Sequence, residues 1–438
     1  MNPTRRPAIV LSSARKTSRL VSAKSEGATR VSHETPCGIL TICGACPILD
    51  LDYRKQLIHK RDELKNLLRS AGGNIAAAQV HECVESLDRF GYRHTAKLVV
   101  SEKPKADGKR WISIGLYKPG SHDVVDIGNC PVQSALVNNI TRYLRGAIRD
   151  FEVSVFTSGG RRSGPTGAGL IRYVVIRTSH SNREALVTFV VATKDWGKLR
   201  LLAHGLRETF SEVKGVTAHL NAQSGNAIFQ FDADPETTGG EDLLAGEAYL
   251  EENMSGLKMR FSATSFMQVN PSVAERLYNR IAEWADLQKT ETAVDLYSGV
   301  GSIALFLAQQ GGKVIGIEEI ASAVSDARTN ASQNKITQAK FYEGRAEVVL
   351  PQLVADGTIK SCAIVTLNPS RRGCQKEVLS AAVSLNPRAI IYMSCFPDTL
   401  VRDLKTLEEL GYVPKFLEPH DMFPGTHHYE VLAYLTRI

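Results

Sequence analysis

The sequence contains no long apolar run: none of its 438 residues belongs to a stretch near the roughly 18 apolar residues of a membrane-spanning helix. No secretory signal precedes its eight cysteines, and it has no internal repeat or low-complexity tract. These absences argue against membrane, secreted and repeat proteins. We therefore expect a cytoplasmic monomer that has reduced thiols and does not bind a membrane.

The length and charge of the chain indicate several domains and an anionic partner. A chain of 438 residues is long enough for two or three domains, and its apolar fraction of 43% is ordinary. The formal net charge is +7, and residues 1–36 alone contain seven Lys or Arg against two Glu. This Ser-rich segment is too polar to fold alone, so we expect a basic flexible tail. An RNA-contacting arm, a solvated extension and an organelle transit peptide remain alternatives for it.

Two hydropathy patterns follow the tail. Residues 37–250 begin with a cysteine group and a helical stripe at Leu51–Ala71, and then alternate as antiparallel strands do, which predicts an α+β module. The strand-like runs are AKLVV, WISIGLY, HDVVDI, RYVVIRT, ALVTFVVA, VTAHLN and AIFQF. The acidic segment Asp232–Glu247 precedes a change of pattern. In residues 251–438, short apolar runs alternate with helical stretches and end in two strands without a helix between them. This predicts an α/β domain with a parallel sheet and a terminal antiparallel hairpin.

The first turn of the predicted parallel sheet has features of a cofactor crevice. The strand TAVDLYS ends in GVGS, where Gly299 and Gly301 let a ligand approach the backbone. The next strand ends in Glu318, a carboxylate placed to accept hydrogen bonds from ribose hydroxyls, and a later strand ends in Asn368. The phosphate loop of nucleotide hydrolases and the full dinucleotide fingerprint are both absent. A glycine turn of any α/β domain is the competing interpretation.

A thiol and a carboxylate lie at the ends of later predicted strands, where they could face the same crevice. Cys395 ends the strand AIIYMS, and Glu430 begins the final strand. A strand-end cysteine followed by Pro397 is a credible nucleophile, although a buried structural cysteine and a solvated Glu are the commoner cases. The pairing of the two residues is the informative feature.

Six segments resemble the motifs of the RNA uracil-5 methyltransferase family. They run in order over residues 265–430 as SFMQVN, DLYSGVG, IE, NPSRRG, MSCFPDTLVRDL and DMFPGTHHYE. With the upstream cysteines and YRHTAK, the resemblance covers nearly all of the chain after about residue 36. It implies a Rossmann-like class I methyltransferase sheet at the C-terminus, preceded by an α+β iron-sulfur and RNA-recognition module.

The resemblance also implies roles for single residues. Cys395 would add to carbon 6 of a uracil to activate carbon 5, and Glu430 would remove the carbon 5 proton. The implied S-adenosylmethionine contacts are Gln268, Tyr297, Glu318 and Asn368, in addition to Gly299, and Phe266 would lie near a flipped base. Asn368, where most members have Asp, is similar to the branch that modifies 23S ribosomal RNA without an N-terminal oligonucleotide-binding barrel. Transfer RNA as substrate, and a weakened RNA-binding paralogue with Ser370 and Phe396 at family positions, remain alternatives.

Three clustered cysteines and one distant cysteine indicate a metal site. Cys37, Cys43 and Cys46 lie close together, and Cys130 supplies a fourth thiol, an arrangement that suits a cubane better than zinc. In the resembled family these positions hold a [4Fe-4S] cluster. The C-x3-C-x2-C spacing of radical enzymes is absent, so we expect a structural cluster. The other cysteines, which we expect to pack in apolar surroundings, are Cys83, Cys362 and Cys374.

Overall fold

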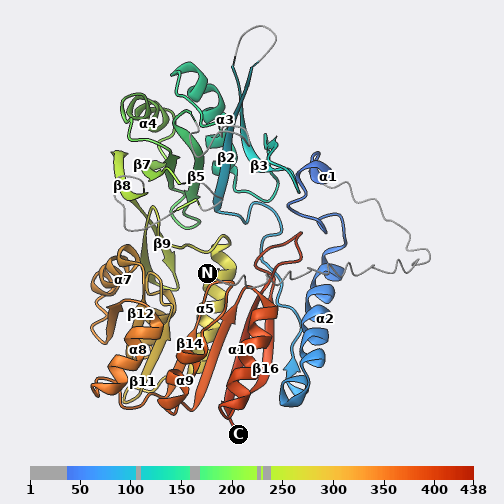
Figure 1. Cartoon of the computed structure of the whole chain (residues 1–438), viewed down its shortest axis with the longest axis vertical. Coiled ribbons are helices and arrows are strands. Elements are labelled where there is room, and N and C mark those ends of the chain that lie inside the picture. Colours follow the sequence, from blue (N-terminus) through green and yellow to red (C-terminus); the bar gives the residue numbers. More distant parts are fainter. Residues whose placement is uncertain (1–36, 105–109, 158–167, 224–227, 230–237) are drawn as a thin grey trace, which may run out of the picture. The chain divides into compact units, whose positions relative to one another are not determined.

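The carboxyl-terminal half contains the predicted parallel sheet. The computed structural model describes residues 37–104, 110–157, 168–223, 228–229 and 238–438. Within these residues, an eight-stranded sheet has the order β1-β16-β17-β15-β14-β11-β12-β13 (Figure 1). Its strands are β1 (Gln79–Val80), β11 (Thr292–Leu296), β12 (Lys313–Glu318), β13 (Ala339–Glu343), β14 (Ile364–Leu367), β15 (Ala389–Ser394), β16 (Tyr412–His420) and β17 (Glu430–Arg437). Strands β14 and β15 are buried along their whole length, as strands covered on both faces must be.

Helices cover both faces of this sheet and divide its core into two layers. The first layer contains α5 (Pro271–Ala285), α6 (Ser302–Ala308) and α7 (Ala321–Gln333). The second contains α2 (Tyr53–Ala71), α8 (Ala346–Ala355), α9 (Lys376–Ser384) and α10 (Pro397–Glu409). Because β11 pairs in parallel with β12 and β14, and β14 with β15, the carboxyl ends of these strands meet at one edge.

The last two strands form the predicted antiparallel hairpin, but β17 is inserted between β15 and β16. Ser394 at the end of β15 lies opposite Val431, and His420 at the end of β16 lies opposite Glu430. The first residue of β17 therefore lies at the edge where the parallel strands end. The edge strand β1 comes from the N-terminal half and pairs in parallel with β16.

A second sheet forms the module expected before residue 250. Among the described residues it has seven strands in the order β4-β3-β2-β5-β6-β7-β8. They are β2 (Thr95–Pro104), β3 (Arg110–Tyr117), β4 (Val124–Asp126), β5 (Ile171–Thr178), β6 (Ala185–Val191), β7 (Val213–Asn221) and β8 (Thr238–Gly246). Helices α3 (Ala135–Asp150) and α4 (Gly197–Thr209) pack against one face. Six of the seven strand-like runs predicted for this region lie in the sheet.

The seventh predicted strand, AIFQF, is wrong where the structure describes it. Ile228 and Phe229 lie in a bend and not in a strand, and the other residues of the run lie outside the described residues. The sheet instead gains β8, inside the acidic segment that we expected only to mark a boundary. Pairing with β7 outweighs the poor strand propensity of its Gly and acidic residues. A hairpin of β9 (Tyr249–Met254) and β10 (Leu257–Ser262) follows and was not predicted.

The segment before the second sheet packs against the carboxyl-terminal sheet. It contains α1 (Leu40–Cys43), the predicted helix α2 and the short 3-10 helix η1 (Gly73–Ala77). Leu64, Leu68 and Ile75 belong to the same core layer as α10, and Figure 1 shows α2 beside α10. Residues Thr35–Ile438 form one compact unit, and the proposed boundaries at 36 and 250 stay predictions. In the part of the chain that the structure describes, no helix is long and apolar enough to cross a membrane.

Candidate active site

A cavity of about 1310 Å³ opens where the parallel strands end. Of the nine residues that the sequence indicated for catalysis, cofactor approach or substrate, Gly301 does not line it and eight do. The eight are Phe266, Gln268, Tyr297, Gly299, Glu318, Asn368, Cys395 and Glu430. Pockets for drug-sized ligands are about 300–1,000 Å³, so this cavity has room for a nucleotide-sized ligand and a second group.

The turn between β11 and α6 forms one wall of the cavity. Tyr297, Gly299 and Gly301 all have a positive φ, and a left-handed backbone costs a residue such as Tyr297 roughly 1–2 kcal/mol. A Cβ on Gly301 would lie 2.8 Å from the Phe341 ring, whereas a Cβ on Gly299 would meet nothing within 4 Å. Gly301 therefore permits close packing of the turn on the sheet, and Gly299 leaves the cavity open.

A buried carboxylate, Asp295, and a half-buried one, Glu318, fix this turn. Asp295 accepts hydrogen bonds from the Ala304 amide at 3.1 Å and from the Thr366 hydroxyl at 2.6 Å, and burial raises its pKa to about 7. Glu318 accepts one from the Gly299 amide and one from the Ile320 amide, each at 2.9 Å. Burial raises the pKa of Glu318, and these amide donors oppose that effect. Both oxygens of Glu318 keep a lone pair for a ligand hydroxyl.

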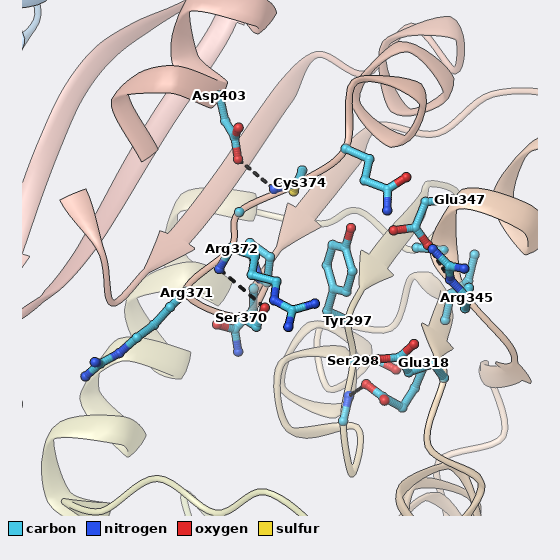
Figure 2. Close-up of a pocket in the computed structure, with 18 of the residues that line it drawn as sticks. Tyr297, Ser298, Glu318, Arg345, Glu347, Ser370, Arg371, Arg372, Cys374 and Asp403 are labelled. Atoms are coloured by element: carbon cyan, nitrogen blue, oxygen red, sulfur yellow. Dashed lines mark hydrogen bonds and ion pairs between the residues drawn. The ribbon is translucent and has the colours of Figure 1, made fainter. Parts of the chain in front are cut away.

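The loop after β14 forms the opposite wall and is held by Asp403 of α10. Its Oδ2 accepts hydrogen bonds from the Cys374 amide and from the Tyr392 hydroxyl, each at 2.7 Å. A Cβ on Gly373 would lie 2.5 Å from the same Asp403 oxygen. Figure 2 shows that Arg371 and Arg372 leave this loop in opposite directions, Arg372 towards Tyr297 and Arg371 away from it.

Cys395, Glu430 and Arg371 form an interacting group in the cavity. Burial is the main cause that raises the pKa of the Cys395 thiol, the Glu430 carboxylate adds to it, and Arg371 lowers it. Glu430 is 3% exposed. Burial raises the pKa of Glu430 to about 8, and Arg371 opposes this shift. A thiol, a carboxylate with a pKa near neutrality and a cation are the parts of a nucleophile and general-base site.

Phe266 and Gln268 come from the segment between β10 and α5. Phe266 is 65% exposed at the cavity, whereas Gln268 is 7% exposed. Asp326 of α7 holds the segment by accepting hydrogen bonds from the Ser262 amide at 2.7 Å and from the Ser265 hydroxyl at 2.8 Å. The exposed Phe266 ring thus projects from a fixed backbone.

The four cysteines predicted to hold a cluster lie near one another. Cys37, Cys46 and Cys130 pack against the small core of Leu49, Tyr92 and Val132. Burial and then the neighbouring Cys130, Cys43 and Cys37 raise the pKa of Cys46 to about 12. All four are free thiols, and no group of three His, Cys, Asp or Glu in the described ranges is arranged to hold a metal ion. Cys83, Cys362 and Cys374 are buried, as predicted.

Comparison with known proteins identifies the family of this chain. Residues 240–438 match the tRNA (uracil-5-)-methyltransferase family model. An RNA methyltransferase of Geobacter sulfurreducens is 35% identical over 90% of this chain and 75% of its own length. One from Clostridium tetani is 32% identical over 95% of this chain and 85% of its own. The chain belongs to the RNA uracil-5 methyltransferase family.

A solved structure of the family has the same fold. Pyrococcus abyssi tRNA (uracil-54, C5)-methyltransferase, crystallised with S-adenosyl-L-homocysteine, is 25% identical, with a TM-score of 0.68 over 89% of this chain and 85% of that one. The prediction of a class I methyltransferase sheet is therefore confirmed. The roles of individual site residues and the iron-sulfur assignment stay predictions.

Arg371 and Tyr278 are among the cavity residues of this uracil-5 methyltransferase family member to which the sequence assigned no role. Arg371 was noted only within the polar step Asn368–Arg371, although its charge acts on both Cys395 and Glu430. Tyr278 of α5 also lines the cavity and is 6% exposed. The position of Arg371 just after a strand-end motif was a usable signal, whereas Tyr278 lies on an apolar helix stripe and gives none.

Proposed function

We propose that the protein transfers a methyl group from S-adenosylmethionine to carbon 5 of a uridine in RNA, with Cys395 as nucleophile and Glu430 as general base. The observation that carries this proposal is the meeting of Cys395, Glu430 and Arg371 in one cavity with the Glu318 turn. Membership of the RNA uracil-5 methyltransferase family supports the reaction type.

The turn between β11 and α6 and the end of β12 fit S-adenosylmethionine. The two Glu318 oxygens are oriented by backbone amides and have lone pairs left for the ribose hydroxyls. The open space beside Gly299 admits the cofactor, and the polar cofactor contacts that we propose come from Gln268, Tyr297 and Asn368. The bound cofactor supplies an electrophilic methyl group on a sulfonium.

The thiol and the carboxylate act in sequence. Carbon 5 of uracil is too weak a nucleophile to take the methyl group unaided, so the Cys395 thiolate first bonds to carbon 6 and the ring becomes an enolate. Carbon 5 then bonds to the methyl carbon as the sulfonium bond breaks. Glu430 removes the carbon 5 proton, the enolate re-forms, and its electrons expel the Cys395 thiolate and restore the ring double bond.

A 5-fluorouridine RNA tests this sequence. Fluorine cannot leave as a proton, so the enzyme should stall as a covalent, methylated protein-RNA complex that survives denaturation. Cys395→Ala should form none and should still bind S-adenosylmethionine. A wild-type protein that binds the RNA but forms no covalent complex would support the alternative of a weakened paralogue, in which Ser370 and Phe396 have ended turnover.

For the substrate, we propose 23S ribosomal RNA, supported by the resemblance of the Asn368 motif to that branch. Transfer RNA is the second candidate, because the solved relative from Pyrococcus abyssi is named for tRNA uracil 54. Mass mapping of both RNAs from a deletion strain decides between them. Loss of a 5-methyluridine from 23S RNA supports the first, and loss from tRNA supports the second.

We also propose that Cys37, Cys43, Cys46 and Cys130 hold a [4Fe-4S] cluster. A single zinc ion needs all its sulfurs about 2.3 Å from one point, whereas a cubane presents a separate iron to each thiolate. Three clustered thiols that neighbour a fourth from a distant segment fit the cubane better, because zinc modules more often use two close pairs. Protein purified without air should be brown and contain about four irons per chain. Zinc with no visible absorbance would contradict the assignment.

A further inference from the structure

Most of the loop that leads to Glu430 is buried, although it has no regular structure; its exposed residues are His427 and His428. Asp421 and Met422 are fully buried, and Glu430 is 3% exposed. A buried loop must find partners for its backbone polar groups, because water cannot reach them. Several of these partners come from the N-terminal half of the chain, more than 300 residues away in sequence.

Helix α2 holds the first half of this loop. The Lys60 ammonium donates to Asp421 Oδ1 at 2.5 Å and to the Phe423 carbonyl at 3.2 Å. The side chains of Lys60 and Asp421 are both 0% exposed. One turn earlier, Gln56 Oε1 accepts a hydrogen bond from the Gly425 amide at 2.9 Å. Two residues on one helix face thus fix both ends of the segment from Asp421 to Gly425.

Residues 37–49, called here the cysteine segment, and Tyr92 hold the same loop from another side. The Ile48 amide donates to the Gly425 carbonyl at 3.1 Å, and the Tyr92 hydroxyl donates to the Pro424 carbonyl at 3.1 Å. A Cβ on Gly425, whose φ is +81°, would lie 2.6 Å from a Leu49 methyl carbon. Tyr92 belongs to the small core against which Cys46 and Cys130 pack.

A buried ion pair is a poor means of adding stability, because desolvation offsets most of the attraction between the charges. Lys60 and Asp421 instead fix the orientation of the loop, because the Lys60 ammonium also donates to the Phe423 carbonyl. From Asp421 the chain runs nine residues to Glu430, where β17 begins opposite His420. A displacement of about 1 Å at a general base can reduce a rate roughly hundredfold.

We infer that Lys60, Gln56 and Tyr92 are positioning residues that hold the 421–425 loop so that Glu430 reaches the carbon 5 proton. The inference rests on the proposed function and goes beyond it, because it assigns a catalytic purpose to α2 and the cysteine segment. It predicts that disturbing these residues slows proton removal and leaves the earlier addition and methyl transfer unaffected.

The experiment compares two buried tyrosines. Tyr92→Phe removes only the hydrogen bond to the Pro424 carbonyl, and Tyr412→Phe removes an equivalent bond to the Pro387 carbonyl. Tyr412 is the control because it begins β16, whereas Glu430 pairs with His420 at the other end of that strand. A third variant, Lys60→Met with Asp421→Leu, removes both buried charges together and leaves none unpaired. Each is given unmodified uridine RNA and methyl-labelled S-adenosylmethionine, and formation and decay of the labelled protein-RNA adduct are timed.

We expect Tyr92→Phe and the double variant to form adduct at the wild-type rate and to release it roughly tenfold to hundredfold more slowly. Tyr412→Phe should lose similar thermal stability and release product normally. Wild-type release from Tyr92→Phe, or equal slowing of formation and release, would overturn the inference. If the double variant does not fold, Tyr92→Phe alone decides. If the wild type forms no adduct on 5-fluorouridine RNA either, the proposed function itself has failed.

Discussion

In the proposed reaction, Cys395 must lose its proton before it attacks, and its neighbours shift the pKa of the thiol in opposite directions. Burial and the Glu430 carboxylate raise the pKa of the thiol, and Arg371 lowers it. Only the thiolate is a nucleophile. At the scale of single residues, the proposal therefore predicts that Arg371 raises the reactive thiolate fraction of Cys395; Arg371 also limits the rise in the pKa of Glu430.

The first residue-scale prediction concerns Arg371→Met. Losing an opposite charge raises a neighbouring pKa by about one or more, so adduct formation on 5-fluorouridine RNA at pH 7 should slow at least tenfold. Raising the pH should restore part of the rate, because it restores thiolate. The measurement is a pH profile of adduct formation beside Arg437→Met, a cation at the far end of β17. If adduct formation is slow and its rate does not change with pH, Arg371 acts only by binding RNA.

A second residue-scale prediction follows from the buried Glu430 carboxyl, whose pKa burial raises from 4.5 to about 8. The folded protein then holds this proton more tightly than the unfolded chain, so stability falls as pH rises from about 4.5 to 8. Glu430→Gln removes this pH-dependent loss of stability. The Tm of the variant should exceed that of the wild type by a few degrees at pH 9, and by much less at pH 5. Equal differences at both pH values would refute a raised pKa at Glu430.

At the scale of elements, the turn between β11 and α6 makes a sharp prediction. Gly301 and Gly256 have nearly the same φ, +83° and +81°, but a Cβ meets the Phe341 ring at 2.8 Å only at Gly301. Both alanine variants should lose stability of about 1 kcal/mol from backbone strain. Only Gly301→Ala should also weaken S-adenosylmethionine binding, by roughly tenfold or more, in a calorimetric titration. Equal affinities would show that this turn does not shape the cofactor site.

The best-predicted elements are those that a local hydropathy pattern identifies. Strands β14 and β15 are short apolar runs between helices, which hydropathy alone identifies. Strand β8 contains Gly, Asp and Glu and forms because β7 offers a partner, a cause that no local pattern reveals. The insertion of β17 beside β15 and the addition of β1 to the far edge are equally non-local.

The candidate site was predictable to the extent that parallel strands end at one edge. This rule alone brings Glu318, Asn368 and Cys395 together. Glu430 joins them because β17 runs antiparallel and begins at that edge. Phe266 and Gln268 were predicted only through the family resemblance, since they come from a segment without a strand or helix pattern of its own. The hydrogen bonds of Lys60 and Tyr92 to the 421–425 loop depend on the tertiary fold and left no trace in the sequence.

At the scale of the whole molecule, the positive charge of the chain bears on RNA binding. The net charge is +7, and residues 1–36, which lie outside the described residues, contain seven Lys or Arg. If they bind phosphates, a chain without them should bind RNA more weakly at low salt. Its plot of log affinity against log salt should be shallower by about 0.7–0.9 for each phosphate that the shortened chain leaves unneutralised. An unchanged slope would identify the segment as a solvated extension.

The most direct test of the account uses Glu430→Gln and Cys395→Ala with methyl-labelled S-adenosylmethionine, unmodified uridine RNA and a denaturing gel. Addition and methyl transfer precede proton removal, so Glu430→Gln should accumulate a shifted band that already carries the label. Its release should be slower by roughly the hundred- to ten-thousandfold typical of losing a general base. Cys395→Ala should give no shifted band and no labelled RNA. Normal release from Glu430→Gln, or labelled RNA from Cys395→Ala, would contradict the assignment of these two residues.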